Sequence, residues 1–242
     1  MEIKEKLEEI TAPAAGPVLD MVSGLLLEGA AGAIVPGVGN LILAYKQQRT
    51  EKNLEVFISQ IVARQDEFNE RLNRLDPEKL EKITGHYFGI VTDYVLNVRQ
   101  QEKIHFIVNG YLRLSETEGV NDDTVMMYYD TLDQLTLMDI AVMKSHHRLL
   151  ATEENEEYMN ILIPGQKHLI HEKLSHLGLV SSENEQRMNK NLQNIANYLL
   201  DMQKGKKNAK LKCDKIWGSD SYRLTDYGRK FLEFFLDMNQ SS

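Results

Sequence analysis

The chain has 242 residues, 42% hydrophobic and 26% charged, a balance that supports a buried core and excludes bulk disorder. Its net charge of −8 disfavours general coating of nucleic acid, although a local basic patch is still compatible with binding. Cys213 is the only cysteine, which excludes an internal disulfide or a cysteine zinc site. The N-terminus lacks the basic start and apolar run of a signal peptide. From both observations we expect a cytoplasmic protein.

Residues 1–45 are expected to form an N-terminal helix followed by a glycine-rich apolar segment. Prolines and a glycine at residues 13–17 end the first helix. Residues 29–45 carry no charge, and this length is near the short limit for a membrane span. Two interpretations stay open: a tightly packed buried turn, favoured because Asp20 and Glu28 are charged, and a hairpin that enters a membrane under some condition. The segment is marked by Gly29, Gly32, Pro36, Gly37 and Gly39.

Residues 46–113 are expected to form a long antiparallel hairpin of two helices. Apolar side chains in the first helix recur at alternating intervals of four and three residues, as in a heptad seam. Asp76 and Pro77 then provide the N-cap and first position of a second helix that runs to about residue 113. So short a turn favours closure of the seam within the chain, and an intermolecular coiled coil is the alternative. The seam comprises Leu54, Ile58, Ile61, Phe68, Leu72 and Leu75.

Residues 121–239 are expected to form a compact helical domain with a small β-wing. Asn121 is placed to cap its first helix, and Gly178 to end the helix that follows Gly165. Residues 222–224 are strand-like, and Thr225 with Asp226 begins the last helix. The core face of that helix is expected to consist of Phe231, Leu232, Phe235 and Leu236. The predicted fold class is therefore mainly α.

Three stretches of this region, LDQLTLMDIAVMKSH, HEKLSHLGLV and YRLTDYGRKFLEFF, resemble the skeleton of winged-helix domains. The resemblance implies a winged-helix-like fold over roughly the last half of the chain, with a β-wing between the second and third stretches. Residues 181–221 are too long for a simple wing and contain a helix of their own. The layout of the whole chain resembles uncharacterised bacterial and prophage proteins of the abortive-infection alpha type, which implies a role in phage defence.

A lysine-rich segment and one helix are the candidate nucleic-acid-binding elements. Residues 204–215 contain six lysines and one aspartate, a net charge of +5 that can neutralise phosphates. The helix over residues 166–177 has a basic and histidine-rich side, as a recognition helix would. A solvated surface is the alternative. The candidates are Lys167, His171, Lys173, Lys204, Lys206, Lys207, Lys210 and Lys212.

No residue pattern predicts a catalytic site, a metal site or a cofactor site. His168 and His171 lack the spaced His-Glu-x-x-His arrangement of zinc enzymes. Gly37 and Gly39 lack the third glycine of a dinucleotide-binding loop. Cys213 lies among lysines but has no identifiable base. We therefore expect a protein that is not an enzyme and uses no cofactor.

The sequence favours a non-enzymatic helical interaction protein, in the setting of bacterial or prophage defence, that binds a partner protein, itself or a membrane. A winged-helix DNA-binding regulator that uses residues 166–177 and 204–215 is the alternative. A further alternative is a membrane-active effector that works through residues 21–45. Association with a membrane is expected only under some condition, and is less favoured than buried packing of that segment.

Overall fold

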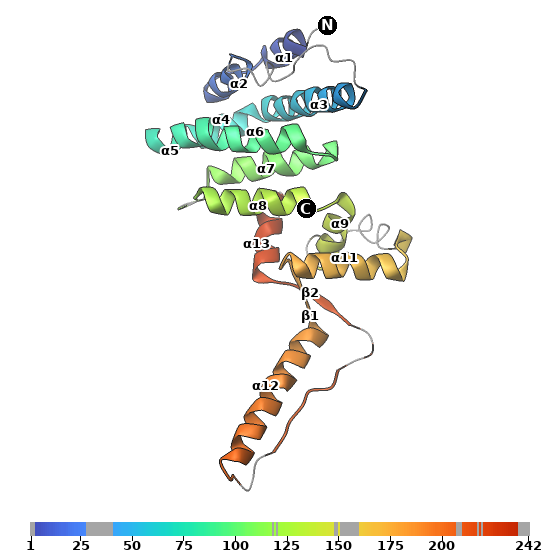
Figure 1. Cartoon of the computed structure of the whole chain (residues 1–242). Coiled ribbons are helices and arrows are strands. Elements are labelled where there is room, and N and C mark those ends of the chain that lie inside the picture. The colour runs from blue at the N-terminus through green and yellow to red at the C-terminus, as the bar shows by residue number, and fades with distance from the viewer. Residues whose placement is uncertain are drawn as a thin grey trace. The chain divides into compact units, whose positions relative to one another are not determined.

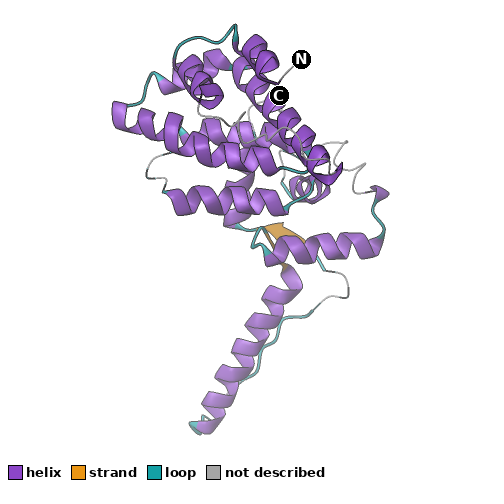
Figure 2. Cartoon of the chain, turned by 45° about the horizontal axis from the view of Figure 1, so that its top comes forward, coloured by secondary structure: helices purple, strands orange, loops and turns teal. Residues whose placement is uncertain are grey.

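The computed structural model is mainly helical (Figures 1 and 2). It describes residues 3–27, 41–117, 119, 121–147, 150, 160–206, 210–216, 218 and 220–236. The chain divides into two compact units, residues 1–137 with 233–240 and residues 138–232 with 241–242. This boundary lies later than the one at residues 113–121 expected from the sequence. Gly29, Gly32, Pro36, Gly37, Gly39 and Lys207 fall outside the described residues.

The first unit is an array of helices. In chain order these are α1 (Ile3–Thr11), α2 (Pro17–Leu27), α3 (Leu41–Ala63), α4 (Gln65–Leu72), α5 (Pro77–Glu81), the π-helix η1 (Lys82–Tyr87), α6 (Phe88–Asn97), the 3₁₀-helix η2 (Gln101–Lys103), α7 (Ile104–Leu114) and α8 (Asp122–Gln134). Among the described residues, no helix is both long and apolar enough to cross a bilayer.

Several helix boundaries of this unit follow the sequence signals. The break at residues 13–17 is confirmed, because α1 ends at Thr11 and α2 begins at Pro17. The Asp76 side chain accepts a hydrogen bond from the backbone N–H of Lys79 at 2.9 Å, and Pro77 occupies the first turn of α5. Asn121 caps α8 in the same way, accepting from the N–H of Thr124 at 2.8 Å.

The predicted continuous helix over residues 78–113 is wrong. A π-helical turn interrupts it at residues 82–87, and α6 ends at Asn97, so that α7 is a separate helix. The buried side chain of Asn53 on α3 donates to the carbonyls of Val95 and Val98, at 3.1 and 2.9 Å. The Val95 carbonyl also accepts from the backbone N–H of Val98 at 3.3 Å, and Asn53 adds a donor to it and to the Val98 carbonyl where α6 ends.

The heptad seam of α3 and α4 packs inside the first unit. Leu54, Ile58, Ile61, Phe68 and Leu72 are buried, and Leu75 is partly buried. Their neighbours include Phe57, whose ring lies 5.9 Å from that of Phe88, and Tyr111, whose ring lies 5.7 Å from that of Phe68. The seam is therefore part of the core of this unit and is not presented at its surface.

The second unit contains α9 (Leu137–Ser145), α11 (Pro164–His176), β1 (Val180–Ser182), α12 (Glu183–Gln203), β2 (Tyr222–Leu224) and most of α13 (Asp226–Phe235). β1 and β2 pair antiparallel, with Val180 opposite Leu224 and Ser182 opposite Tyr222. The strand at residues 222–224 and the terminal helix are thus confirmed. Phe231, Leu232, Phe235 and Leu236 are buried, as expected for the core face of that helix.

Candidate interaction surface on helix α12

Helix α12 forms an arm that extends away from the β1–β2 pair, with the returning chain beside it (Figures 1 and 2). The arm begins at Ser182, whose hydroxyl accepts from the backbone N–H of Glu185 at 2.9 Å. This N-cap starts a helix of 21 residues, about 31 Å long at 1.5 Å per residue. Because β1 and β2 pair at the base of the arm, the chain between these two strands contains a long helix.

Two asparagines hold the returning segment, residues 210–216, along one side of α12. Asn191 bonds to both backbone groups of Asp214: its amide nitrogen donates to the carbonyl at 2.8 Å, and its amide oxygen accepts from the N–H at 2.6 Å. Asn194 donates to the carbonyl of Lys212 at 2.9 Å, and Lys190 forms an ion pair with Asp214 at 2.7 Å. These side chains of α12 are thus hydrogen-bond partners for backbone groups of the segment.

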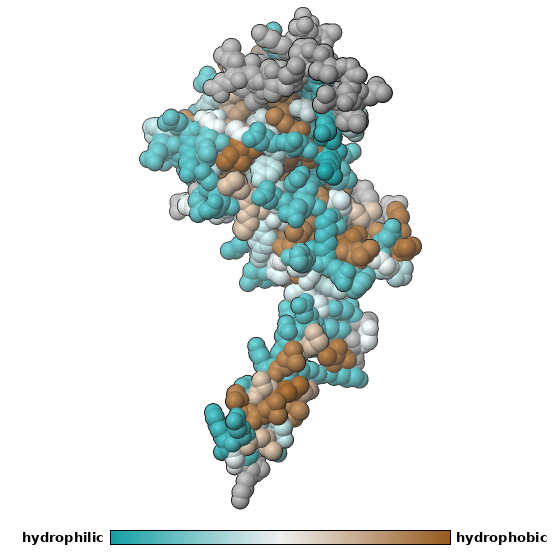
Figure 3. Space-filling model, viewed as in Figure 1, coloured by the Kyte–Doolittle hydropathy of each residue, from teal (hydrophilic) through white to brown (hydrophobic). Residues whose placement is uncertain are grey.

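A row of apolar side chains on α12 is exposed to solvent. We call it the α12 stripe, and its members are between 37% and 60% exposed. They recur at intervals of four and three, so they lie on one face of the helix. Figure 3 shows this apolar surface as brown atoms on the arm. The α12 stripe consists of Met188, Leu192, Ile195, Leu199 and Met202.

The apolar surface continues beyond the stripe. Leu211 and Ile216 on the returning segment are each about half exposed. Leu200 on α12 is also exposed, and no residue of α12 is buried among those described. Exposed apolar side chains grouped in this way are typical of interaction surfaces, because burying them removes apolar atoms from water.

Helix α11, the candidate recognition helix, uses part of its polar side for contacts within its own unit. Lys173 forms an ion pair of 2.5 Å with the buried carboxylate of Asp139 on α9. The ring of His171 stacks on that of Tyr222 at 4.1 Å and lies 2.9 Å, between Nε2 atoms, from that of His146. His171 and Lys173 are thus engaged inside the unit, whereas Lys167 is partly exposed.

The exposed surface near α11 is apolar and mixed in charge. Ile161 and Ile163, which precede the helix, and Leu169 within it are each more than half exposed. The imidazole of His168 lies 3.3 Å from the carboxylate of Glu172 on the same face. Such a surface suits a protein partner better than a phosphate backbone, because apolar contacts and a carboxylate face outward.

Burial controls the protonation of the histidine pair. It lowers the pKa of His146 to about 4, with a smaller contribution from His171, and it also lowers the pKa of His171. Partial burial alone would raise the pKa of Asp220, but hydrogen bonds from Ser182 and from two backbone N–H groups bring it below its ordinary value. Within the described residues, no three His, Cys, Asp or Glu side chains are grouped as a metal site.

The described lysines of residues 204–215 are spread along the arm. Lys204 and Lys206 follow the end of α12 that is farther from β1, whereas the carbonyl of Lys212 accepts from Asn194 and that of Lys215 from Arg187. Lys204, Lys206, Lys210 and Lys212 are exposed, and Lys206 pairs with Asp201 at 2.8 Å. Lys204 and Lys206 are separated from the end of α11 by the length of α12, about 30 Å, so these two lysines do not form one continuous patch with α11. Cys213 in the same segment is a free, exposed thiol.

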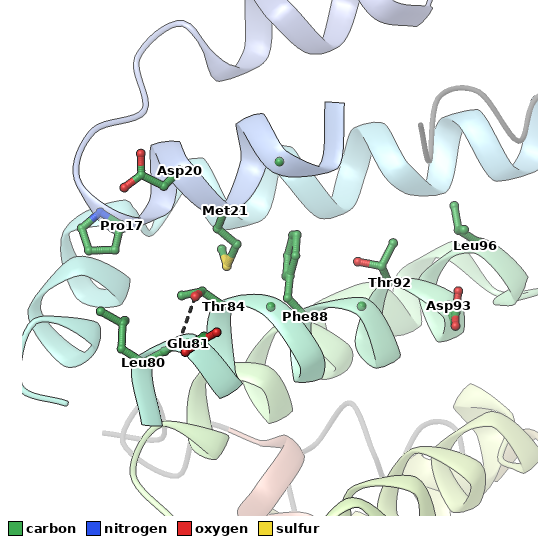
Figure 4. A pocket seen from close by; sticks show the side chains of 13 residues that line it. Pro17, Asp20, Met21, Leu80, Glu81, Thr84, Phe88, Thr92, Asp93 and Leu96 are labelled. Carbon is green, nitrogen blue, oxygen red and sulfur yellow. Dashed lines mark hydrogen bonds between the residues drawn. The ribbon is translucent and has the colours of Figure 1, made fainter. Parts of the chain in front are cut away.

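The first unit contains a cavity of about 610 Å³ between α2 and the η1–α6 helix (Figure 4). Met21, Leu80 and Phe88 give it an apolar lining. Thr92 also lines it, and its buried hydroxyl has no hydrogen-bond partner among the residues that the structure describes, whereas Thr84 donates to the Leu80 carbonyl at 2.9 Å. Its size is that of small-ligand pockets. The lining also includes three carboxylates, those of Asp20, Glu81 and Asp93. This mixture of apolar and acidic side chains defines no single ligand chemistry.

Comparison with protein-family models, curated proteins and solved structures finds no match to this chain.

Neither the α12 stripe nor the cavity was predicted from the sequence. A signal for the stripe was present, because residues 188–202 show the same four-and-three spacing as the seam in α3 and α4. The cavity had no comparable signal. Its lining comes from α2 and from a helix some sixty residues later in the chain, and only tertiary packing brings them together.

Proposed function

We propose that this chain is a non-enzymatic interaction protein that binds another polypeptide through the α12 stripe. The observation that carries the proposal is the row of five exposed apolar side chains at heptad spacing. A partner helix packed against this row would bury the five apolar side chains, which would insert between side chains of the partner as in a coiled coil. Bacterial or prophage defence, implied by the resemblance of the chain's layout, is the biological setting we propose.

The rigidity of the arm supports this function. The N-cap at Ser182 and the asparagine bonds to residues 212–214 fix α12 and its returning segment together before any partner binds. Preorganisation of this kind lowers the entropy lost on binding. The exposed apolar residues before and within α11 offer a second contact for the same partner.

The proposal is tested with the variant Leu192→Lys/Leu199→Lys, which places two charges in the stripe. Chemical crosslinking and mass spectrometry in the native host are compared for this variant and the full-length wild-type chain. Gln193→Lys/Asn197→Lys is the matched control, because it adds the same charges to other exposed positions of α12. Crosslinks at α12 that only the stripe variant loses support the function. Identical crosslinks in all three chains refute it.

Nucleic-acid binding is the second candidate, favoured by the exposed lysines Lys204, Lys206, Lys210 and Lys212 of the arm. It predicts affinity for duplex DNA that falls steeply as salt rises, because phosphate contacts release counterions. Fluorescence polarisation with wild type and Lys204→Glu/Lys210→Glu/Lys212→Glu tests it. Binding that survives this triple change excludes the lysines as the contact. In that case, a loss of binding in Lys167→Glu would show that α11 contacts the DNA.

A further inference from the structure

The positions that flank the α12 stripe carry no charge. In a heptad description the stripe residues occupy the two core positions, and the flanking positions are Asn184, Asn189, Asn191, Ala196, Tyr198 and Gln203. Charges at such positions normally select one partner helix and repel others. From Asn191 to Leu200 the helix contains no charged residue at all. A second copy of α12 would therefore meet no like charge along the centre of the stripe.

The two ends of α12 differ in charge, and this difference selects a direction for pairing. Glu185 is exposed and occupies the core position one step before Met188. Lys204 and Lys206 are exposed just beyond Met202 at the other end. Two parallel copies would place Glu185 against Glu185 and lysine against lysine, and both contacts are repulsive.

An antiparallel pair centred on Ile195 removes this repulsion. It places Met188 of one copy opposite Met202 of the other, and Leu192 near Leu199. Residue 185 then lies opposite residue 205, so that the Glu185 carboxylate falls between the other copy's Lys204 and Lys206. The opposed helix dipoles add to this preference. The contact is self-complementary, as a two-fold dimer requires.

We infer that the occupant of the α12 stripe is the α12 stripe of a second copy of this chain, paired antiparallel; this inference rests on the proposed function and names its partner. The seam covers about 21 Å of helix, so the dimer is small and its affinity is modest. Leu211 and Ile216 on the returning segments enlarge the apolar surface available to the pair.

Sedimentation velocity of the full-length chain over about a hundredfold range of concentration tests the pairing. Wild type is expected to shift from monomer to dimer as concentration rises. Leu192→Lys/Leu199→Lys is expected to stay monomeric, and the control Gln193→Lys/Asn197→Lys to dimerise like wild type. A wild-type monomer throughout, or a dimer that the stripe variant retains, overturns the inference.

Charge exchange and disulfide trapping test the direction. Glu185→Lys is expected to weaken the dimer, and Glu185→Lys/Lys204→Glu to restore it. In a Cys213→Ser background, Met188→Cys mixed with Met202→Cys is expected to form a mixed disulfide. Formation of a disulfide between two Met188→Cys chains instead would show parallel pairing and overturn the antiparallel arrangement.

These outcomes separate the inference from the function on which it rests. A monomeric wild type whose stripe-dependent crosslinks lead to a different protein overturns self-pairing and keeps the proposed function. A monomer with no stripe-dependent crosslink overturns both.

Discussion

A β-carbon on Gly228 would lie 2.0 Å from the carbonyl oxygen of Leu179, so α13 approaches the chain before β1 at a distance that only glycine allows. Thr225, three residues earlier, fixes this approach. Its hydroxyl accepts from the N–H of Gly228 at 2.9 Å and donates to the carbonyl of Gly178 at 2.6 Å. The Thr-x-x-Gly pattern in YRLTDYG is thus explained by a helix cap and a close backbone contact.

Replacing Gly228 with alanine is expected to destabilise the second unit by more than about 2 kcal/mol, because backbone must move to admit the methyl group. Gly165→Ala in α11 is the control, since a β-carbon there meets no atom within 4 Å. It should be neutral or stabilising by up to about 1 kcal/mol. Urea unfolding followed by circular dichroism measures both variants, and equal effects would contradict the assigned contact.

Replacing Asn53 with alanine is expected to destabilise the first unit by about 1–3 kcal/mol, because two buried hydrogen bonds are lost, although the Val95 carbonyl keeps the N–H of Val98 as a donor. Asn97→Ala removes only an exposed bond to the carbonyl of Asp93 and is expected to cost less than about 1 kcal/mol. Thermal unfolding compares the two. A loss for Asn53→Ala no larger than that of the control would show that the end of α6 does not depend on α3.

Replacing Lys173 with methionine is expected to destabilise the second unit by about 1–3 kcal/mol, because the buried Asp139 carboxylate loses a cationic partner. Lys167→Met on the same helix should change the free energy of unfolding by less than about 0.5 kcal/mol. Denaturant titration of both variants makes the comparison. This difference would establish Lys173 as a structural residue of α11.

Acidification is expected to destabilise the second unit through His146. Its pKa is lowered to about 4 in the folded protein, so the unfolded chain binds a proton more readily. The stability that depends on a neutral His146 is fully present above about pH 6.5 and is lost as pH falls from there towards 4. It amounts to about 1–2 kcal/mol of the free energy of unfolding after allowance for partial exposure of the ring. The groups facing the ring are His171 on α11 and, beyond it, Tyr222 and Asp220.

Hydrogen exchange of α9 and α11 between pH 7.5 and 4, corrected for the intrinsic rate, measures this effect. His146→Leu should remove most of the pH dependence, because the titrating ring is absent. The exposed His176→Gln on α11 serves as the control and should leave it in place. A slope that survives in His146→Leu would assign the acid sensitivity to other groups.

Removing the two asparagine anchors is expected to release residues 210–216 from α12. Asn191→Ala/Asn194→Ala loses three hydrogen bonds to that segment, which corresponds to an increase of about tenfold or more in local opening. Trypsin, which cleaves after lysine, should therefore cut at Lys212 and Lys215 at least several-fold faster. Asn197→Ala, an exposed residue of the same helix, should be cut at the wild-type rate.

Local signals in the sequence were sufficient for several helix ends. Asp76 and Asn121 cap their helices through contacts within three residues. Gly178 ends α11 with φ of +71°, a conformation that favours glycine. Each of these features depends on neighbours in the chain, and for that reason a residue type at a given spacing is enough to predict it.

The break between α6 and α7 could not be predicted in this way. The hydrogen bonds that stabilise it come from Asn53, more than forty residues earlier, and nothing near Val98 except its own β-branched side chain disfavours a continuous helix. The partnership of Lys173 with Asp139 is equally remote in sequence, so a lysine that resembles a phosphate contact proves to be an internal ion pair.

The chain contains two heptad seams with the same spacing, of which one is buried and the other is exposed. The sequence by itself determines that Leu54, Ile58 and Ile61 share one helix face and that Leu192, Ile195 and Leu199 share another. Only the tertiary structure decides that the first face is buried inside its unit and the second is exposed on an arm. The physical reason is that periodicity records which side of a helix is apolar, whereas burial depends on which other helices pack against that side.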